Sequence, residues 1–242
     1  MPILAVSLLC AQPPQADPEL QKIANVCPPE DIQALGLVCA EQNPCPVYLE
    51  VTSVDGFGAT IFVTGNLHTV DTTLAGILLA STDSGKTWSE PAKRIRSAAL
   101  GQIQFFDPQH GWVSGNLLDP LPREPFLLLT VDGGRTWRRT AIPGDPEFGS
   151  IPQFWFDSAT RGQLVVDRSQ GAAAKYELYS TSDGGGTWAL KSTPTEAPRI
   201  EEAQPQADWR AVADKDSYEV QRRTAESWET LARFPTLAGE CK

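Results

Sequence analysis

Short apolar runs, bounded by glycine, proline and small polar residues, recur along most of this chain. Residues 77–80, 126–129 and 176–179 form three such runs, and each is followed by a polar turn and a tryptophan. Two further runs precede each of them, as at 103–107 and 111–115. Short runs with frequent turn residues are typical of strands in tight hairpins. The pattern predicts an all-β protein.

The turns that follow these three runs are internal repeats. They occupy residues 81–88, 130–137 and 181–188, and each has the form [ST]-x-D-x-G-x-T-W, with tryptophans 49 and 51 residues apart. A near-constant period of this length predicts one four-stranded sheet per repeat, as in a propeller blade. The repeated positions are Asp83, Gly85, Thr87, Trp88, Asp132, Gly134, Thr136, Trp137, Asp183, Gly185, Thr187 and Trp188.

The residue types in this octapeptide suit a tight turn. A short aspartate carboxylate at the end of a strand can accept N–H groups from the turn that it begins. Glycine supplies the positive φ that such a turn needs, and the indole can cover the turn and pack between sheets. We therefore interpret the aspartates as turn formers and predict no catalytic, metal or cofactor role for them.

The repeats divide the chain into four predicted blades, at about 46–97, 98–146, 147–198 and 199–237. The fourth keeps the rhythm of strands and a Ser-Trp pair at 227–228, but Arg223 and Ala225 stand where the box aspartate and glycine would be. Terminal repeats are commonly atypical. Three blades with clear boxes and one degenerate blade are therefore expected.

These motifs resemble the Asp-box, or bacterial neuraminidase, repeat of sialidases and of many non-enzymatic propellers. The combined pattern F-x-D…G-W-x-x-G…T-x-D-G-G-x-T-W is most similar to the photosystem II assembly and stability factor family, over residues 46–236. The resemblance implies a β-propeller. That family typically has seven blades and a basic binding face, whereas this chain has four predicted blades and a net charge of −10. A role in photosystem assembly does not carry over.

The net charge and the N-terminal residues limit the classes of partner and the compartment that are expected. A net charge of −10 on 242 residues argues against nucleic acid and anionic lipid as partners. Residues 1–11 are nearly all apolar and a polar segment follows, which predicts a secretory signal over 1–16 and an exported, periplasmic or extracellular protein. Lipidation at Cys10 is the alternative that would bring membrane contact.

Four cysteines remain after that segment: Cys27, Cys39, Cys45 and Cys241. An even number in an exported protein predicts two disulfides. Because the blades are expected to leave no terminal strand to exchange, we hypothesise that Cys45–Cys241 staples the ring and Cys27–Cys39 closes a loop in the 17–45 extension. The alternative is an open arc that pairs with a second copy. The extension also carries one predicted short helix, at 28–36, that caps an end of the propeller.

The sequence contains no recognisable catalytic centre. The F/Y-R-x-P motif of sialidases is absent from the first blade, and the similar residues 121–125 lie in a variable loop. We therefore predict a non-enzymatic scaffold or assembly factor with an unidentified protein partner. The alternative is a glycan-binding or glycan-cleaving protein, which three arginines converging on the channel would favour.

Loops between second and third strands, at 68–73, 116–125 and 168–175, are the predicted contact regions, with plain surface insertion as the alternative. Trp112 and Trp155 lie inside apolar strands, which favours core packing over exposure as binding aromatics.

Overall fold

A computed structural model describes residues 18–24, 27–144, 148–169, 174–200 and 208–242 of the chain. The predicted signal segment and Cys10 lie outside these residues. One short helix, α1 (Pro29–Ala34), precedes a succession of strands. The predicted all-β fold is confirmed.

The strands form four antiparallel sheets in chain order, the blades of a propeller. The first sheet contains β1 (Cys45–Phe57), β2 (Thr60–His68), β3 (Thr73–Ser81) and β4 (Ile95–Arg96). The second contains β5 (Ala98–Phe105), β6 (Gly111–Leu118), β7 (Pro122–Thr130) and β8 (Arg138–Ala141). The third contains β9 (Ser150–Phe156), β10 (Gly162–Asp167), β11 (Tyr176–Thr181) and β12 (Ala189–Ser192). The fourth contains β13 (Trp209–Asp214), β14 (Ser217–Arg223) and β15 (Trp228–Pro235).

The aspartates of the repeated octapeptide hold their turns through hydrogen bonds. Asp83 accepts the Thr87 N–H at 2.9 Å and the Thr87 hydroxyl at 2.6 Å, and the Ser81 hydroxyl donates to it at 2.8 Å. Asp132 and Asp183 have the same partners in their own turns. Hydrogen bonds from the threonine hydroxyl and N–H lower the pKa of all three carboxyls to about 2. Each of these side chains is therefore fully engaged in its turn.

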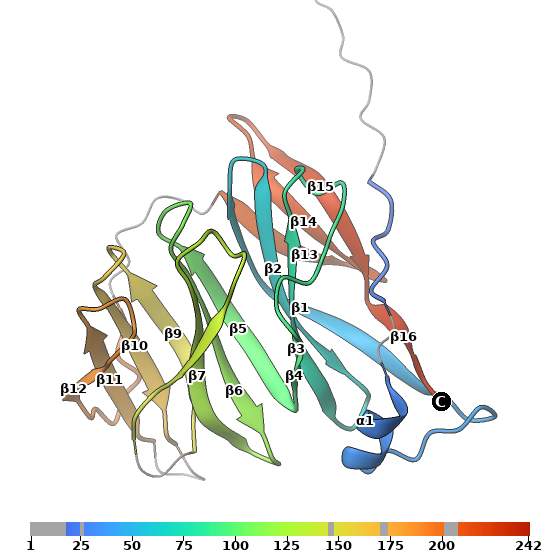
Figure 1. The fold of residues 1–242 in the computed structure, drawn as a ribbon, viewed down its shortest axis with the longest axis horizontal. Helices are drawn as coiled ribbons and strands as arrows, with labels where there is room; N and C mark the ends of the chain where they lie inside the picture. The colour runs from blue at the N-terminus through green and yellow to red at the C-terminus, as the bar shows by residue number, and fades with distance from the viewer. Residues whose placement is uncertain (1–17, 25–26, 145–147, 170–173, 201–207) are drawn as a thin grey trace, which may run out of the picture.

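The four sheets form an open arc rather than a closed ring. Their innermost strands pack in the order β13, β1, β5, β9. Three hydrophobic clusters fill the three interfaces of this arc, and within the described residues no fourth cluster joins the third sheet to the fourth. Figure 1 shows the third sheet at one side and the fourth at the other, with the first and second between them.

Each box turn packs against the sheet that precedes it in this arc. The Trp112 indole of the second sheet donates to the Gly184 carbonyl in the third box at 2.8 Å. Gly134 in the second box lies against the Phe62 ring of the first sheet, and a side chain there would collide with that ring. The fourth sheet comes first in the arc, so a box there would have no sheet to pack against. This position in the arc is consistent with Arg223 and Ala225 standing where the box aspartate and glycine would be.

The end of the chain differs from the prediction that no strand is exchanged. The last strand, β16 (Leu237–Cys241), leaves the fourth sheet and pairs with the start of β1, with Cys45 opposite Cys241. The fourth sheet therefore has three strands of its own. Its outer edge is extended by the N-terminal segment, where Leu20 bridges to Arg233. Both chain ends thus reinforce the junction of the first and fourth sheets.

All four cysteines form disulfides, but the hypothesised pairing is wrong. Cys27 is bonded to Cys241, with Cα atoms 5.1 Å apart, and Cys39 is bonded to Cys45, with Cα atoms 5.4 Å apart. The prediction assumed that the extension closes on itself. Instead the extension runs beside β15 and β16, which brings Cys27 to Cys241 (Figure 1).

The predicted helix is present as α1, and it anchors the extension to the arc. Ile32 and Leu35 pack against the cluster shared by the first and fourth sheets. Arg94 donates to the Ala24 carbonyl at 2.8 Å, and Arg96 forms an ion pair with Asp31. The extension is therefore docked on the body by apolar, polar and covalent contacts. No helix among the described residues is long and apolar enough to cross a bilayer.

Candidate functional site

Side chains on the innermost strands hold neighbouring sheets together. At the first interface, Ser53 accepts the Ile103 N–H at 3.2 Å. Asp55 accepts the Phe105 N–H at 2.6 Å. Burial raises the pKa of Asp55 to about 6, although the N–H groups of Phe105 and Gly56 oppose this, and the charge of Asp208 adds to it. One inner strand thus grips the backbone of the next.

The second interface repeats this contact in a two-way form. The Gln102 amide donates to the Phe154 carbonyl at 3.0 Å and accepts its N–H at 3.2 Å. Gln104 makes the same pair of bonds with Phe156, both at 2.9 Å. A side-chain amide with one donor and one acceptor can therefore hold an extended backbone in place.

The third sheet begins the same contact, although no sheet follows it in the arc. Gln153 donates to the Ile200 carbonyl at 3.1 Å and accepts its N–H at 3.3 Å. Ile200 is buried. It occupies the place that the inner strand of a next sheet would take. The side of the third sheet that points away from the second, here called the free face, thus holds a backbone segment of the chain itself through Gln153.

The free face differs from the two interior faces at equivalent positions. Phe62 and Trp112 lie near the start of the second strand of their sheets, and each has only 2% of its surface exposed. Gln163, at the same position of the third sheet, is exposed. Ala80 and Leu129 precede the first two boxes, and Ser180 precedes the third. The free face is therefore polar where the interior faces are apolar, which is expected of a terminal repeat.

The inner strand shows the opposite change. Asp55 and Gln104 are the side chains that bind the backbone of the next inner strand, at Phe105 and Phe156. Trp155 stands at the equivalent position of the third sheet. The Trp155 indole N–H is buried and has no hydrogen-bond partner among the described residues. Such a donor is costly to leave unpaired, and Trp188 in the box of the same sheet carries another one.

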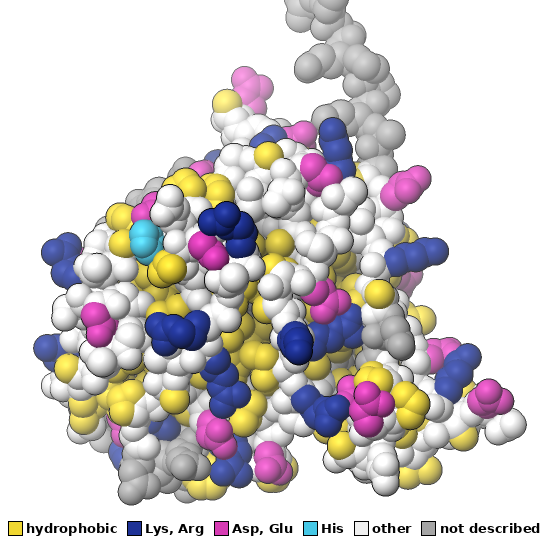
Figure 2. Space-filling view, viewed as in Figure 1, with side chains coloured by type: hydrophobic (Ala, Val, Ile, Leu, Met, Phe, Trp, Pro, Cys, Tyr) yellow, Lys and Arg dark blue, Asp and Glu magenta, His cyan; other side chains and the backbone are white. Residues whose placement is uncertain are grey.

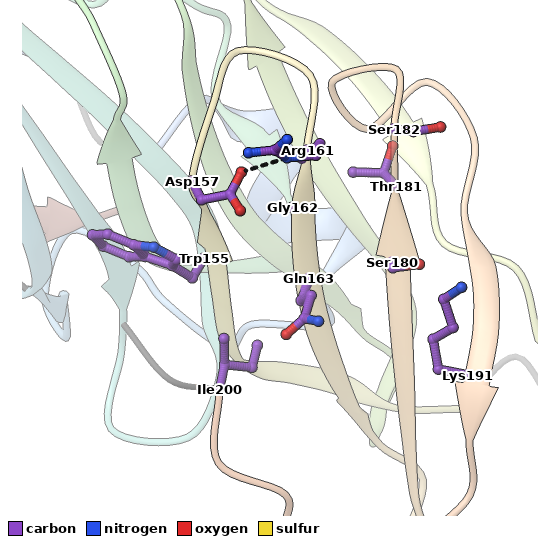
Figure 3. Close-up of a pocket in the computed structure, with 10 residues that line it drawn as sticks. All are labelled: Trp155, Asp157, Arg161, Gly162, Gln163, Ser180, Thr181, Ser182, Lys191 and Ile200. Atoms are coloured by element: carbon purple, nitrogen blue, oxygen red, sulfur yellow. Dashed lines mark hydrogen bonds and ion pairs between the residues drawn. The ribbon is translucent and has the colours of Figure 1, made fainter. Parts of the chain in front are cut away.

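A hollow of about 550 Å³ lies on the free face. It takes Trp155, Gln163, Ser180 and Lys191 from the four strands of the sheet, and Ile200 from the segment beyond them (Figure 3). Arg161 lies at one end and pairs with Asp157, with Nε and Oδ1 3.2 Å apart. Lys191 has no ion-pair partner in the part of the chain that the structure describes. This combination of one aromatic and several unengaged polar groups makes the hollow the candidate site.

No family model and no curated protein matches the chain. Solved structures do resemble it. They include YCF48 bound to D1 peptide, at 19% identity and a TM-score of 0.43, covering 77% of this chain and 56% of that one. A PL25 ulvan lyase gives 10% identity and a TM-score of 0.45, covering 77% and 51%. The GH74 xyloglucanase of Xanthomonas campestris gives 15% identity and a TM-score of 0.40, covering 74% and 28%.

The chain thus spans about half the length of the first two of these structures. At such low identities the likeness concerns the fold, and the function of this chain is inferred from its own residues.

The predicted contact loops lie at the end of the sheets where the second and third strands connect. Two further hollows form there, of about 520 Å³ and 320 Å³. The first is lined by residues 69–72 and by the extension, and the second by Leu121, Phe148 and Ser169, among others. The second hollow thus takes residues from two of the predicted loops.

Arg168, the first residue of the third predicted loop, is not a surface contact residue. Only 3% of it is exposed, and its Nε donates to Glu177 at 2.8 Å. Its other nitrogens donate to the carbonyls of Phe148 and Pro143 at 2.6 and 2.9 Å. Burial would raise the pKa of Glu177, but hydrogen bonds from Arg168 and Tyr179 outweigh it and the pKa is lowered. This ion pair fixes the connection between the second and third sheets.

Trp112 and Trp155 both lie inside apolar strands in the sequence, but they differ in burial in the structure. Trp112 is buried and stacks on Phe156, with ring centroids 3.7 Å apart. Trp155 lines the hollow on the free face and is only partly buried. The period of about 50 residues aligns the two sheets but does not say which sheet is last in the arc. The sequence does carry one sign of this difference. The tryptophan lies on the second strand of the second sheet (Trp112) but on the inner strand of the third sheet (Trp155).

The arginines do not converge on this site. Among the described arginines only Arg161 lines the hollow, and basic side chains are spread over the face seen in Figure 2. Three other arginines, Arg94, Arg222 and Arg233, form ion pairs with carboxylates elsewhere. Within the described residues there is also no cluster of potential metal ligands.

Proposed function

We propose that this protein is a non-enzymatic scaffold that binds an extended segment of a partner protein across the free face. The observation that carries this proposal is the two-way bond of Gln153 to the Ile200 backbone. The same bond joins the second sheet to an extended strand of the third. An extended backbone is therefore the chemistry that this face recognises, and peptides that add to sheets are commonly held through their main chain.

A further sheet is a poorer occupant than a single segment. A docked sheet needs an apolar face to pack on, and Gln163, Ser180 and Lys191 give the free face polar groups instead. The other end of the arc, on the fourth sheet, is covered by its own polar side chains. Arg210 donates to Gln221 at 2.7 Å, and Gln221 donates to Glu219 at 2.8 Å. Head-to-tail pairing of two copies is therefore not favoured at either end.

The proposed setting is outside the cytoplasm, in the periplasm or the extracellular space. The chain has two disulfides, and disulfides persist mainly in oxidising compartments. The apolar residues 1–11 fit a signal for export. Partner proteins are therefore expected among exported or envelope proteins.

Selection of short random peptides on the purified chain tests the proposal. Selected peptides would be titrated against wild type, Trp155→Ala and Trp228→Ala by calorimetry. Trp228 serves as the matched control, because it lies on the fourth sheet beneath Arg210, with the guanidinium carbon 4.1 Å from the ring centroid. We expect Trp155→Ala to weaken binding about tenfold, as loss of an aromatic anchor does, and Trp228→Ala to leave it unchanged. Failure to select peptides, or equal binding to both variants, would overturn the proposal.

A glycan ligand is the second candidate. It is favoured by the groups that line the hollow beside Trp155, because amide, hydroxyl and charged side chains can bond to sugar hydroxyls. A glycan array probed with wild type and Trp155→Ala separates the two candidates. Binding of glycans that depends on Trp155, without binding of peptides, would replace the scaffold by a glycan-recognition protein.

A further inference from the structure

Three hydrogen-bond donors stand in a row on the free face. Gln163 on β10 is the direct cross-strand partner of Ser180 on β11, so their side chains lie next to one another. Lys191 on β12 lines the same hollow beside them (Figure 3). None of the three side chains has a hydrogen-bond or ion-pair partner among the described residues.

The row is peculiar to the free face. In the second sheet, Trp112, Leu129 and Thr140 hold these positions, because Thr140 and Lys191 each stand three residues after a box tryptophan. Trp112 and Leu129 are buried in the cluster between the second and third sheets. Thr140 is opposite Leu127, which belongs to the same cluster. The change from two apolar groups and a hydroxyl to an amide, a hydroxyl and an ammonium therefore occurs where the arc ends.

A row of an amide N–H, a hydroxyl and an ammonium matches a carboxylate. A carboxylate has two oxygens that accept several hydrogen bonds, and bonds with one charged partner are stronger than neutral ones. Lys191 is exposed and has no ion-pair partner among the described residues, which is also true of Lys86 and Lys93, but Lys191 is the lysine that lines the hollow. Arg161, the other cation of the hollow, is already paired with Asp157.

We infer that the segment bound on the free face presents a carboxylate to Gln163, Ser180 and Lys191. This inference rests on the proposed function and adds the chemistry of the partner. The carboxylate comes either from an acidic side chain or from the C-terminus of the partner. Trp155 lies on the inner strand of the same hollow, where its ring can pack against the same segment.

Peptides whose binding depends on Trp155 provide the test. Each would be made in four forms: unchanged, with Asp and Glu replaced by Asn and Gln, with an amidated C-terminus, and with both changes. Loss of binding in the second form identifies an acidic side chain, and loss in the third form identifies the C-terminus. Equal binding of all four forms would overturn the inference while leaving the proposed function intact, whereas absence of any Trp155-dependent peptide would remove both.

Variants of the chain give the complementary readout. Lys191→Met keeps most of the stem and removes the charge, and we expect it to weaken the acidic form about fivefold to tenfold while changing the neutral form less than about twofold. Lys93→Met is the matched control, since Lys93 is exposed on the first sheet's outer loop. Lys191→Glu should bind a peptide with lysine in place of the acidic residue. If Lys191→Met and Lys93→Met bind the acidic form equally, the carboxylate does not lie on this row.

Discussion

The two ends of the arc are finished in different ways. On the fourth sheet, polar side chains bond to one another: Arg233 donates to Asp214 at 3.1 Å, and Thr230 donates to Glu219 at 3.1 Å. On the third sheet, Trp155, Gln163 and Lys191 line a hollow and have no such partners among the described residues. One end is covered by its own bonded groups, whereas the other has polar groups without internal partners among the described residues, and for that reason we propose it as the binding end.

The covalent and backbone contacts follow the same division. The fourth sheet is joined to the first by β16 and by the Cys27–Cys241 bond, and its edge is extended by the N-terminal segment. Among the described residues, the free face binds the backbone of Ile200 through Gln153. The two ends of the arc therefore differ in how they are joined to the rest of the chain.

The largest effect is expected from opening the closed end. Replacing Cys27 and Cys241 by serine removes a link between residues 214 apart in sequence, whereas Cys39 and Cys45 are only 6 apart. On the chain-entropy model the first link contributes about 5 kcal/mol and the second about 2 kcal/mol. Urea unfolding of the two double variants measures this difference. Equal losses would mean that the long link does not hold the fourth sheet in place.

The next effect compares equivalent faces of two sheets. Trp112→Ala removes a buried ring that stacks on Phe156 and donates to Gly184, so we expect it to lower the free energy of unfolding by about 3–5 kcal/mol. Trp155→Ala removes a partly exposed ring at the free face and should cost less than about 1.5 kcal/mol. Denaturant midpoints give both values. A large loss for Trp155→Ala would indicate that the free face is part of the core.

The third effect concerns pH at the interior of the arc. The pKa of Asp55 is about 6 in the folded chain, above its usual value of 3.8, because burial disfavours its charge. The contribution of this group to stability is fully present below pH 4 and is lost as pH rises through 6, by about 3 kcal/mol. Asp55→Asn should flatten the free energy of unfolding between pH 4 and 7. An unchanged slope in that variant would assign the pH dependence to other groups.

The box aspartates act in the opposite direction. Hydrogen bonds lower the pKa of Asp83, Asp132 and Asp183 to about 2, so their stabilising effect is present above pH 4 and is lost as pH falls towards 2. Stability should therefore have its maximum near pH 4 to 5. Thermal unfolding across this range checks the position of the maximum.

The smallest effect on folding is expected at the free face itself. Gln163→Leu places an apolar group on an exposed position, and the free energy of unfolding should change by less than about 0.5 kcal/mol. The variant should instead self-associate, because an apolar group extends the surface around Trp155. Sedimentation at rising concentration measures this association. A variant that remains monomeric and binds peptides normally would show that Gln163 does not separate the free face from an interior one.

Much of the fold was predictable because its signals are local. The octapeptide repeat predicts each turn from residues such as Asp132 and Gly134, whose partners lie within the same turn. The order of the sheets in space was not predictable, since it depends on contacts between Trp209 and Gly56, 153 residues apart. The disulfide pairing failed for the same reason, because the path of the extension along β15 has no local signal.

The candidate site was only partly predictable. The sequence places Trp155 inside an apolar strand, which favours the core, and its partial exposure follows only from the third sheet being last in the arc. The sequence shows Gln163 and Ser180 in the third repeat at the positions that Trp112 and Leu129 hold in the second. They acquire meaning once the strands are in register and the interior faces can be compared position by position.

The most direct test of the open arc is the accessibility of its free face. Cysteine would be placed at Gln163 and, for comparison, at Ser114, which is 1% exposed within the second sheet. Alkylation of the folded monomer by iodoacetamide would be followed by mass spectrometry. The open arc predicts that the cysteine at 163 reacts at nearly the rate of an unfolded peptide while the cysteine at 114 is protected. Equal protection of both cysteines would show that the third sheet is covered, and the account would be wrong.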